Sequence, residues 1–219
     1  MNMIKKIICA AAFLMTALFT QAQPFAEEIA AFKKQDSIAF PPKRAILFVG
    51  SSSFRLWKDM QDYFPAYPII NRGFGGSSFL DVIRYAGEII LPYNPKQILI
   101  YCENDFANND SLQPVDVTQR FVVLFNIIRK KYKKVPIAYI SMKPSPSRTR
   151  LMPRFEATNE LIKNFLATKK RTAYIDVYHA MLQADGTPMP DIFIQDKLHM
   201  NAKGYRIWQK IIEPYLLKN

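Results

Sequence analysis

Short apolar runs alternate along this chain with segments whose apolar residues recur every three or four positions. The runs are 45–49, 98–101, 135–140 and 174–177, with a shorter and weaker one at 68–71. Runs of this length are typical of strands that are buried on both faces of a sheet. Because strands that alternate with helices are joined by right-handed crossovers, the pattern predicts a mostly parallel sheet of five strands.

Helical periodicity is found in three segments between or after these runs. We expect each apolar stripe to face the core rather than a binding partner. The stripes are formed by Phe121, Leu124, Phe125, Ile128 and Tyr132, by Phe155, Leu161, Ile162, Phe165 and Leu166, and by Tyr205, Trp208, Ile212, Tyr215 and Leu216. The sequence has no internal repeat and no linker rich in Pro, Gly or Ser, and its 219 residues suit one domain.

The amino terminus has the three-part form of a secretory signal peptide. Lys5 and Lys6 precede an apolar run at 7–20, and small residues occupy the cleavage positions that end at Ala22. A membrane anchor is the alternative, but a spanning helix needs ~20 apolar residues, and this run has 14. We therefore expect a periplasmic or secreted protein with a signal peptide at 1–22, an N-terminal segment that packs on the domain at 23–43, and the domain itself at 44–219.

The cysteine and charge content disfavours several classes of protein. Only Cys102 remains after removal of the signal peptide, so no intramolecular disulfide can form. Cys102, His179 and His199 lack the spacing of a zinc site. The formal net charge of +12 is expected to belong to a basic surface. An anionic glycan or lipid surface is an alternative partner, whereas nucleic acid is not expected, because the sequence has no recognisable binding motif.

Four polar segments are expected where ligands bind in an open parallel sheet, beyond the carboxyl ends of the strands. The first, Gly50-Ser51-Ser52-Ser53, directly follows an apolar run. A serine at a strand-to-helix turn presents its hydroxyl beside free backbone N–H groups, which suits a nucleophile. A serine that caps the helix is the alternative. The G-x-S-x-G elbow of α/β-hydrolases is absent.

The other three segments carry groups that can complete such a site. The loop 71–78 has three glycines in four residues, which allows a backbone N–H to point at a developing oxyanion, although a tight turn is the alternative. Asn104 can donate a hydrogen bond from its amide, or can form a turn. Asp196 can orient the imidazole of His199, although an isolated D-x-x-H pattern is a weak signal.

In this chain order, the four segments resemble the Ser, Gly, Asn and D-x-x-H blocks of the SGNH, or GDSL, hydrolase family. The resemblance spans about 45–205. Its glycine segment is similar to the platelet-activating-factor acetylhydrolase branch. The resemblance implies a three-layer α/β/α sandwich of the flavodoxin-like type, with a five-stranded, mostly parallel sheet. It also implies a carboxylic ester hydrolase that requires no cofactor and no metal.

Carried over residue by residue, the resemblance implies a Ser-His-Asp triad and an oxyanion hole. Ser52 aligns with the nucleophile, His199 with the general base and Asp196 with its orienting carboxylate. The backbone N–H groups of Ser52 and Gly76 and the side-chain amide of Asn104 align with the oxyanion donors.

Two positions depart from the family's pattern, and one histidine lies outside it. Ser51 stands where the family's name motif has Asp. Cys102 stands where the Asn block usually has Gly, so a positive φ there would imply strain or a rearranged loop. His179 follows the last apolar run and is expected to be structural or partly buried.

The substrate class is indicated by the resemblance and by one basic loop. Members of the family cleave acetyl groups from sugars and acyl chains from lipids and small esters. The basic loop 143–148 offers Lys143, Ser145 and Arg148 as candidate substrate contacts, or is a plain surface loop. We expect an esterase for small acyl groups, acetyl esters of carbohydrates above all, with no stable membrane insertion after signal cleavage. The alternatives are a lipid-directed acylhydrolase, or a glycan-binding module on the same fold without activity.

Overall fold

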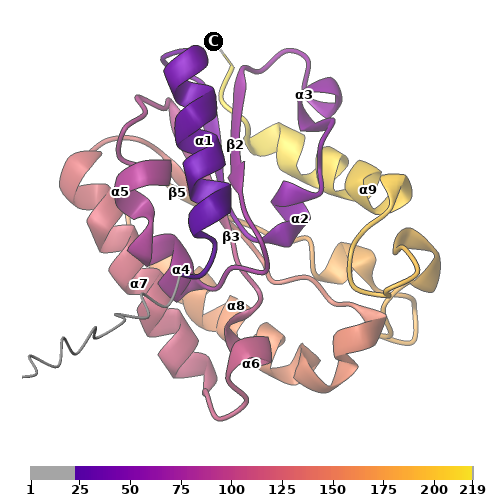
Figure 1. Cartoon of the computed structure of the whole chain (residues 1–219). Coiled ribbons are helices and arrows are strands. Elements are labelled where there is room, and N and C mark those ends of the chain that lie inside the picture. Colours follow the sequence, from indigo (N-terminus) through magenta and orange to yellow (C-terminus); the bar gives the residue numbers. More distant parts are fainter. Residues whose placement is uncertain (1–22, 219) are drawn as a thin grey trace, which may run out of the picture.

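The computed structural model describes residues 23–218, and in it five parallel strands form one sheet in the order β2-β1-β3-β4-β5 (Figure 1). All four neighbouring pairs are parallel. The strands are β1 (Ile46–Gly50), β2 (Ile69–Gly73), β3 (Gln97–Tyr101), β4 (Ile137–Ile140) and β5 (Thr172–Ile175). Each strand overlaps one of the apolar runs, so the predicted five-stranded parallel sheet is confirmed.

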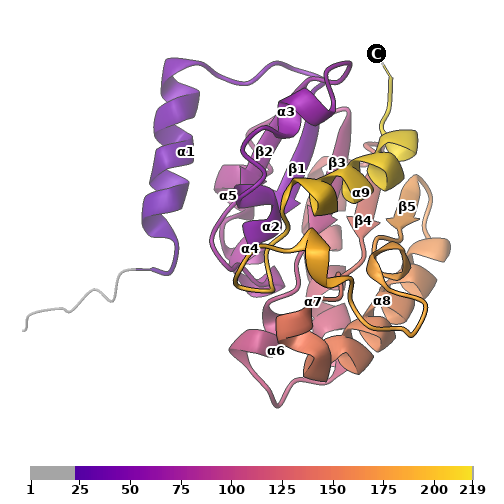
Figure 2. The same ribbon diagram turned by 90° about the vertical axis from the view of Figure 1, so that its right-hand side faces the viewer.

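Helices pack on both faces of this sheet and complete the predicted α/β/α sandwich (Figure 2). One face carries α4 (Phe79–Arg84), α5 (Ala86–Ile89), α7 (Pro114–Lys131) and α8 (Met152–Ala167), and the other carries α2 (Ser52–Arg55), α3 (Met60–Tyr63) and α9 (Ala202–Ile212). Helix α6 (Asp105–Asn108) follows β3. The 3-10 segments are η1 (Pro146–Leu151), η2 (His179–Met181), η3 (Pro190–Ile192) and η4 (Glu213–Tyr215), of which η1 is kinked at Arg148 and the other three are single turns.

The residues at the two ends of α7 are typical of helix termini. Gln113 and Asp116 form a reciprocal capping box at its start, and Pro114 occupies its first turn, where its missing N–H costs nothing. Three basic residues occupy the last turn, where cations interact favourably with the helix dipole. The same kind of capping box, between Ser78 and Asp81, begins α4 directly after the glycine segment.

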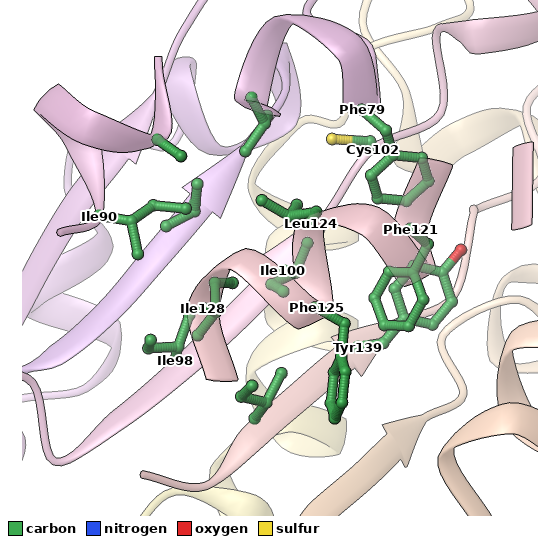
Figure 3. Close-up of a cluster of buried hydrophobic side chains, with 14 of the residues drawn as sticks. Phe79, Ile90, Ile98, Ile100, Cys102, Phe121, Leu124, Phe125, Ile128 and Tyr139 are labelled. Atoms are coloured by element: carbon green, nitrogen blue, oxygen red, sulfur yellow. The ribbon is translucent and has the colours of Figure 1, made fainter. Parts of the chain in front are cut away.

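The apolar core consists of two clusters, one on each face of the sheet. Figure 3 shows part of the first cluster, in which Ile98 and Ile100 of β3 lie near Leu124 and Ile128 of α7. Neighbouring strand residues contribute to opposite clusters, because successive strand side chains point to opposite faces. Cys102 belongs to the first cluster and is fully buried.

The three predicted helical stripes face the core with two exceptions. Leu161 of α8 is 41% exposed and Tyr215 is 42% exposed. Leu161 directly precedes the buried Ile162, and neighbouring positions of a helix point about 100° apart. Tyr215 lies in the 3-10 turn η4, beyond the end of α9 at Ile212, where the helical period no longer applies.

Helix α1 (Ala26–Ile38) lies beyond the β2 edge of the sheet (Figure 2). Its Asp36 forms an ion pair with Arg72 of β2, and both side chains are largely buried. Phe25, just before the helix, packs edge-on against Phe74 with ring centroids 5.3 Å apart. The 23–43 segment thus covers an edge strand whose backbone would otherwise be open to pairing.

The predicted signal peptide at 1–22 lies outside the described residues. Within 23–218, no helix combines the length and the hydropathy that a membrane span requires.

Candidate active site

Three of the polar segments leave the sheet side by side. In the strand register, Gly50 at the end of β1 is the partner of Gly73 in β2 and of Tyr101 in β3. Gly50 has a φ of +149°, and a Cβ at this position would lie 1.7 Å from the Tyr101 carbonyl oxygen. Only glycine fits there, so the chain can turn sharply into the serine segment directly above β3.

Ser52 begins the short helix α2 and faces a histidine from the far end of the chain. Its Oγ lies 2.9 Å from Nε2 of His199. Ser51 is the cap residue of α2, but its side chain makes no capping hydrogen bond. Ser52 as a whole is 6% exposed. The hydroxyl of Ser52 therefore faces the imidazole rather than acting as a helix cap.

The D-x-x-H segment is a tight turn in which the aspartate holds the histidine. Asp196 Oδ2 lies 2.6 Å from Nδ1 of His199. Asp196 Oδ1 accepts hydrogen bonds from the backbone N–H groups of Leu198 and His199, each at 2.9 Å. Lys197 adopts a left-handed φ of 55°, which closes the turn. Partial burial acts to raise the pKa of Asp196, but the hydrogen bonds from His199 and Leu198 outweigh it and lower that pKa below its usual value.

A second D-x-x-H segment, Asp176 to His179, has the same carboxylate–imidazole contact but no serine. Nδ1 of His179 lies 2.7 Å from Oδ2 of Asp176. The His179 side chain is 65% exposed, and its Nε2 lies 4.0 Å from Oε1 of Glu156. The expectation that His179 is partly buried is wrong, because the turn after β5 faces solvent, whereas its contact with Asp176 is compatible with the structural role that is the other expectation. The serine contact, rather than the sequence pattern, therefore distinguishes the two histidines.

The glycine segment brings Gly76 beside Asn104. A Cβ at Gly76 would lie 3.6 Å from Nδ2 of Asn104. The preceding Gly75 has a left-handed φ of +32°, and its N–H donates to Oε2 of Glu28 in α1 at 3.0 Å. Ser77 Oγ donates to the carbonyl oxygen of Gly50 at 3.0 Å and ties the loop to the serine segment. The predicted segments are thus in direct contact.

Asn104 is buried, and both ends of its amide are hydrogen-bonded. Nδ2 donates to Ser51 Oγ at 2.7 Å and makes a longer contact of 3.4 Å with the Ser77 carbonyl oxygen. Oδ1 accepts from Nη2 of Arg148 at 2.6 Å. Asp105, the next residue, accepts from the backbone N–H of Phe79 at 3.0 Å and so ties the start of α4 to the Asn104 loop. Burial raises the pKa of Asp105.

Two of the three candidate substrate contacts in the loop 143–148 are buried. Lys143 and Ser145 are both 0% exposed, so the expectation that they contact substrate is wrong. Lys143 Nζ lies 2.9 and 3.1 Å from the two carboxylate oxygens of Glu103, which is also buried. A buried ammonium must be paired, and Glu103 supplies the opposite charge. Arg148 is near the site, but its guanidinium is bound to Asn104.

The two departures from the family's pattern have simple structural explanations. Cys102 is not among the described residues with positive φ, so its loop is not strained there. Its thiol is buried in the core, and burial raises its pKa well above the usual value. Ser51, in place of the family's Asp, is the residue whose hydroxyl accepts from the Asn104 amide.

Sequence reasoning missed the carboxylates that support the site, namely Glu28, Glu103 and Asp105. Asp105 and Glu103 adjoin Asn104 in the sequence, so their position was a usable signal. Glu28 lies 47 residues before its partner Gly75, and nothing local indicates the contact. Among residues 23–218, no cluster of three or more His, Cys, Asp or Glu side chains is arranged to hold a metal ion.

Comparison with known proteins shows which family has these segments. The model of the GDSL-like lipase/acylhydrolase family matches residues 36–207, which is most of the chain. A search of the curated proteins finds no match.

Solved structures share the fold at low sequence identity. A protein from Streptococcus pneumonia, provisionally described as a platelet activating factor, superposes with a TM-score of 0.76 at 16% identity, covering 87% of this chain and 92% of that one. A provisionally assigned acylhydrolase from Bacteroides fragilis gives 0.71 at 18% identity, with coverages of 90% and 96%. An acetyl-xylooligosaccharide esterase from Geobacillus, in an R55A mutant form, gives 0.62 at 13%, with coverages of 78% and 93%.

Proposed function

The chain belongs to the GDSL-like lipase/acylhydrolase family and is an ester-cleaving hydrolase, and from this premise we propose that Ser52 is its nucleophile. His199 is the general base and Asp196 the carboxylate that orients it. The observation that carries the proposal is the continuous series of contacts from Asp196 through His199 to Ser52, at 2.6 and 2.9 Å. This arrangement supplies both a base within reach of the hydroxyl and a group that holds the base.

Acylation begins when Ser52 Oγ attacks the ester carbonyl carbon and its proton passes to Nε2 of His199. Asp196 accepts from Nδ1 of His199 and stabilises the imidazolium that forms. The carbonyl oxygen becomes an oxyanion, and the proposed donors to it are the backbone N–H groups of Ser52 and Gly76 and the amide of Asn104, which lies beside Gly76. Each such donor is typically worth ~3 kcal/mol of transition-state stabilisation.

Acylation ends when the tetrahedral species collapses and His199 gives its proton to the oxygen of the leaving alcohol, which departs and leaves the acyl group on Ser52. Deacylation repeats these steps with water. His199 then takes a proton from water as the water oxygen attacks the acyl carbon. When the second tetrahedral species collapses, the bond between Ser52 Oγ and the acyl carbon breaks and His199 returns its proton to Ser52 Oγ, which releases the carboxylic acid and restores both residues.

We propose small acyl esters as substrates, and acetyl esters of carbohydrates in particular. The glycine segment 73–76 resembles the small-acyl branch of the family. A structural neighbour from Geobacillus is named as an acetyl-xylooligosaccharide esterase. We further propose that 1–22 directs export and is removed, which the intact mass of the protein recovered from the periplasm or the medium tests.

The substrate proposal is tested by comparing rates on p-nitrophenyl acetate and p-nitrophenyl octanoate, and then on acetylated xylooligosaccharides and lysophospholipid. We expect kcat/KM to favour acetate over octanoate, and acetic acid to be released from the acetylated sugar. Ser52→Ala is the blank for each substrate. Faster cleavage of octanoate together with lysophospholipid hydrolysis would overturn the acetyl proposal in favour of a lipid-directed enzyme. No hydrolysis of any ester would leave a binding module and overturn the enzymatic proposal.

A further inference from the structure

We infer that Arg148 positions Asn104 for catalysis by fixing which end of the amide faces the oxyanion. This inference rests on the proposed function, in which Asn104 donates a hydrogen bond to the oxyanion. It replaces the expectation that Arg148 binds substrate.

An asparagine amide can turn over and exchange its oxygen and its nitrogen, so a donor role needs a contact that tells the two ends apart. The Ser51 hydroxyl, 2.7 Å from Nδ2, cannot do this, because a hydroxyl accepts or donates equally well. The Ser77 carbonyl oxygen only accepts, but its contact with Nδ2 is long, at 3.4 Å. An arginine only donates, and Nη2 of Arg148 lies 2.6 Å from Oδ1.

The guanidinium of Arg148 is itself held in place. Its Nη1 lies 3.4 Å from the backbone carbonyl oxygen of Glu103 and 3.5 Å from a Glu103 carboxylate oxygen. Lys143 Nζ lies 2.9 Å from the same carboxylate oxygen, and Glu103 and Lys143 are both almost completely buried. The Arg148 side chain is only 13% exposed. A buried series of charges therefore fixes the arginine, and the arginine fixes the amide.

The loop of Arg148 is also attached to the turn that carries the histidine. The N–H of Ser147 donates to the Lys197 carbonyl oxygen at 3.1 Å. Lys197 lies between Asp196 and His199 in the D-x-x-H turn. The backbone that carries Arg148 thus holds both halves of the proposed site, the oxyanion donor and the base, in one arrangement.

Removing Arg148 lets the amide turn over. In the rotated amide, Oδ1 faces Ser51. The Ser51 hydroxyl can donate to Oδ1, so this oxygen keeps a hydrogen-bond partner. The oxygen then occupies the donor's place and repels the oxyanion. The loss affects the transition state, where the negative charge exists, and leaves substrate binding nearly unchanged.

The test is steady-state kinetics on Arg148→Gln and Arg148→Lys with p-nitrophenyl acetate and an acetylated sugar. Arg150→Gln is the matched control, because Arg150 lies in the same segment η1 but is 73% exposed and pairs with Asp110. We expect kcat to fall about 10- to 100-fold in both Arg148 variants, by the same factor for both substrates, with KM changed by less than about twofold. Lysine retains a charge for Glu103 but lacks the planar fork that reaches Asn104 as well.

A double-mutant cycle with Asn104→Ala shows whether Arg148 acts through Asn104. Once the amide is removed, Arg148→Gln should cause almost no further loss of kcat, so the two effects should be strongly non-additive. A purely structural role would lower the melting temperature of the single variant, whereas we expect Arg148→Lys to melt near the wild type. Additive losses, or a raised KM with unchanged kcat, would overturn the inference and leave the triad intact. Retained activity in Ser52→Ala would instead overturn the proposed function itself.

Discussion

Replacing Asn104 with aspartate should separate a catalytic role of this residue from a structural one. In the structure, Oδ1 of Asn104 accepts from Arg148 at 2.6 Å and Nδ2 donates to Ser51 at 2.7 Å. A carboxylate at this position would form an ion pair with Arg148, and the Ser51 hydroxyl could donate to it instead of accepting. We therefore expect Asn104→Asp to fold and to melt at or above the wild-type temperature.

The rate should respond very differently from the stability. Loss of one oxyanion donor typically costs ~3 kcal/mol, which corresponds to about a 10²- to 10³-fold fall in kcat. The new carboxylate also places negative charge beside the oxyanion, so Asn104→Asp should be at least as slow as Asn104→Ala. KM should change little, because the oxyanion exists only beyond the ground state.

Steady-state kinetics with p-nitrophenyl acetate, together with a thermal melt, measure both quantities. Asn108→Asp is the matched control, because Asn108 is an exposed amide in the next turn of the chain. If Asn104 only forms a turn, aspartate replaces it well, and kcat stays near the wild-type value. That result would remove Asn104 from the oxyanion hole and refute the reasoning.

Three further predictions concern the histidines and the buried charges. His199→Ala should lower kcat by about 10³-fold or more. His179→Ala removes an imidazole that contacts an aspartate but no serine, so it should leave kcat nearly unchanged in the same assay, and reversed effects would contradict the triad. Lys143→Met should lower the free energy of unfolding, measured in urea, by about 3–5 kcal/mol, because it leaves the buried Glu103 carboxylate short of a partner. Lys163→Met removes an exposed ion pair and should lower it by under about 1 kcal/mol, so equal losses would show that burial of the pair does not matter. Burial acts to raise the pKa of Glu103, but its two cationic neighbours outweigh it and lower that pKa. Because the folded state then binds this proton more weakly than the unfolded state, the contribution is complete above about pH 4.3 and is lost below it, so the melting temperature should fall between about pH 5 and pH 3; a rise would contradict the assignment.

The order of strands and polar segments could be predicted because it depends on local patterns. The run 45–49 has no polar residue and is too short for a typical helix, which favours a strand buried on both faces, and β1 is indeed an interior strand and fully buried. Gly50 then has to end that strand, since no other residue fits against Tyr101. A serine directly after such a glycine is delivered to the carboxyl edge of the sheet, where the other segments also arrive.

The environment of charged side chains could not be predicted in the same way. Lys143 follows a strand in a basic loop, and its sequence neighbourhood indicates exposure. Its burial depends on Glu103, which lies 40 residues earlier in the chain.

The D-x-x-H spacing is equally uninformative by itself, because Asp176 and His179 form the same carboxylate–imidazole contact as Asp196 and His199. In the structure, the contact of His199 with Ser52, 147 residues away, separates the two histidines.

Peptide mapping after labelling with a fluorophosphonate tests most directly whether Ser52 is the nucleophile. Three adjacent serines compete for this role, but the Ser51 hydroxyl is bound to Asn104, Ser53 is 1% exposed, and only Ser52 contacts the imidazole of His199. We expect the adduct on Ser52, no adduct in Ser52→Ala, and retained labelling in Ser51→Ala and Ser53→Ala. An adduct on Ser51 or Ser53, or labelling that survives in Ser52→Ala, would contradict the proposed mechanism.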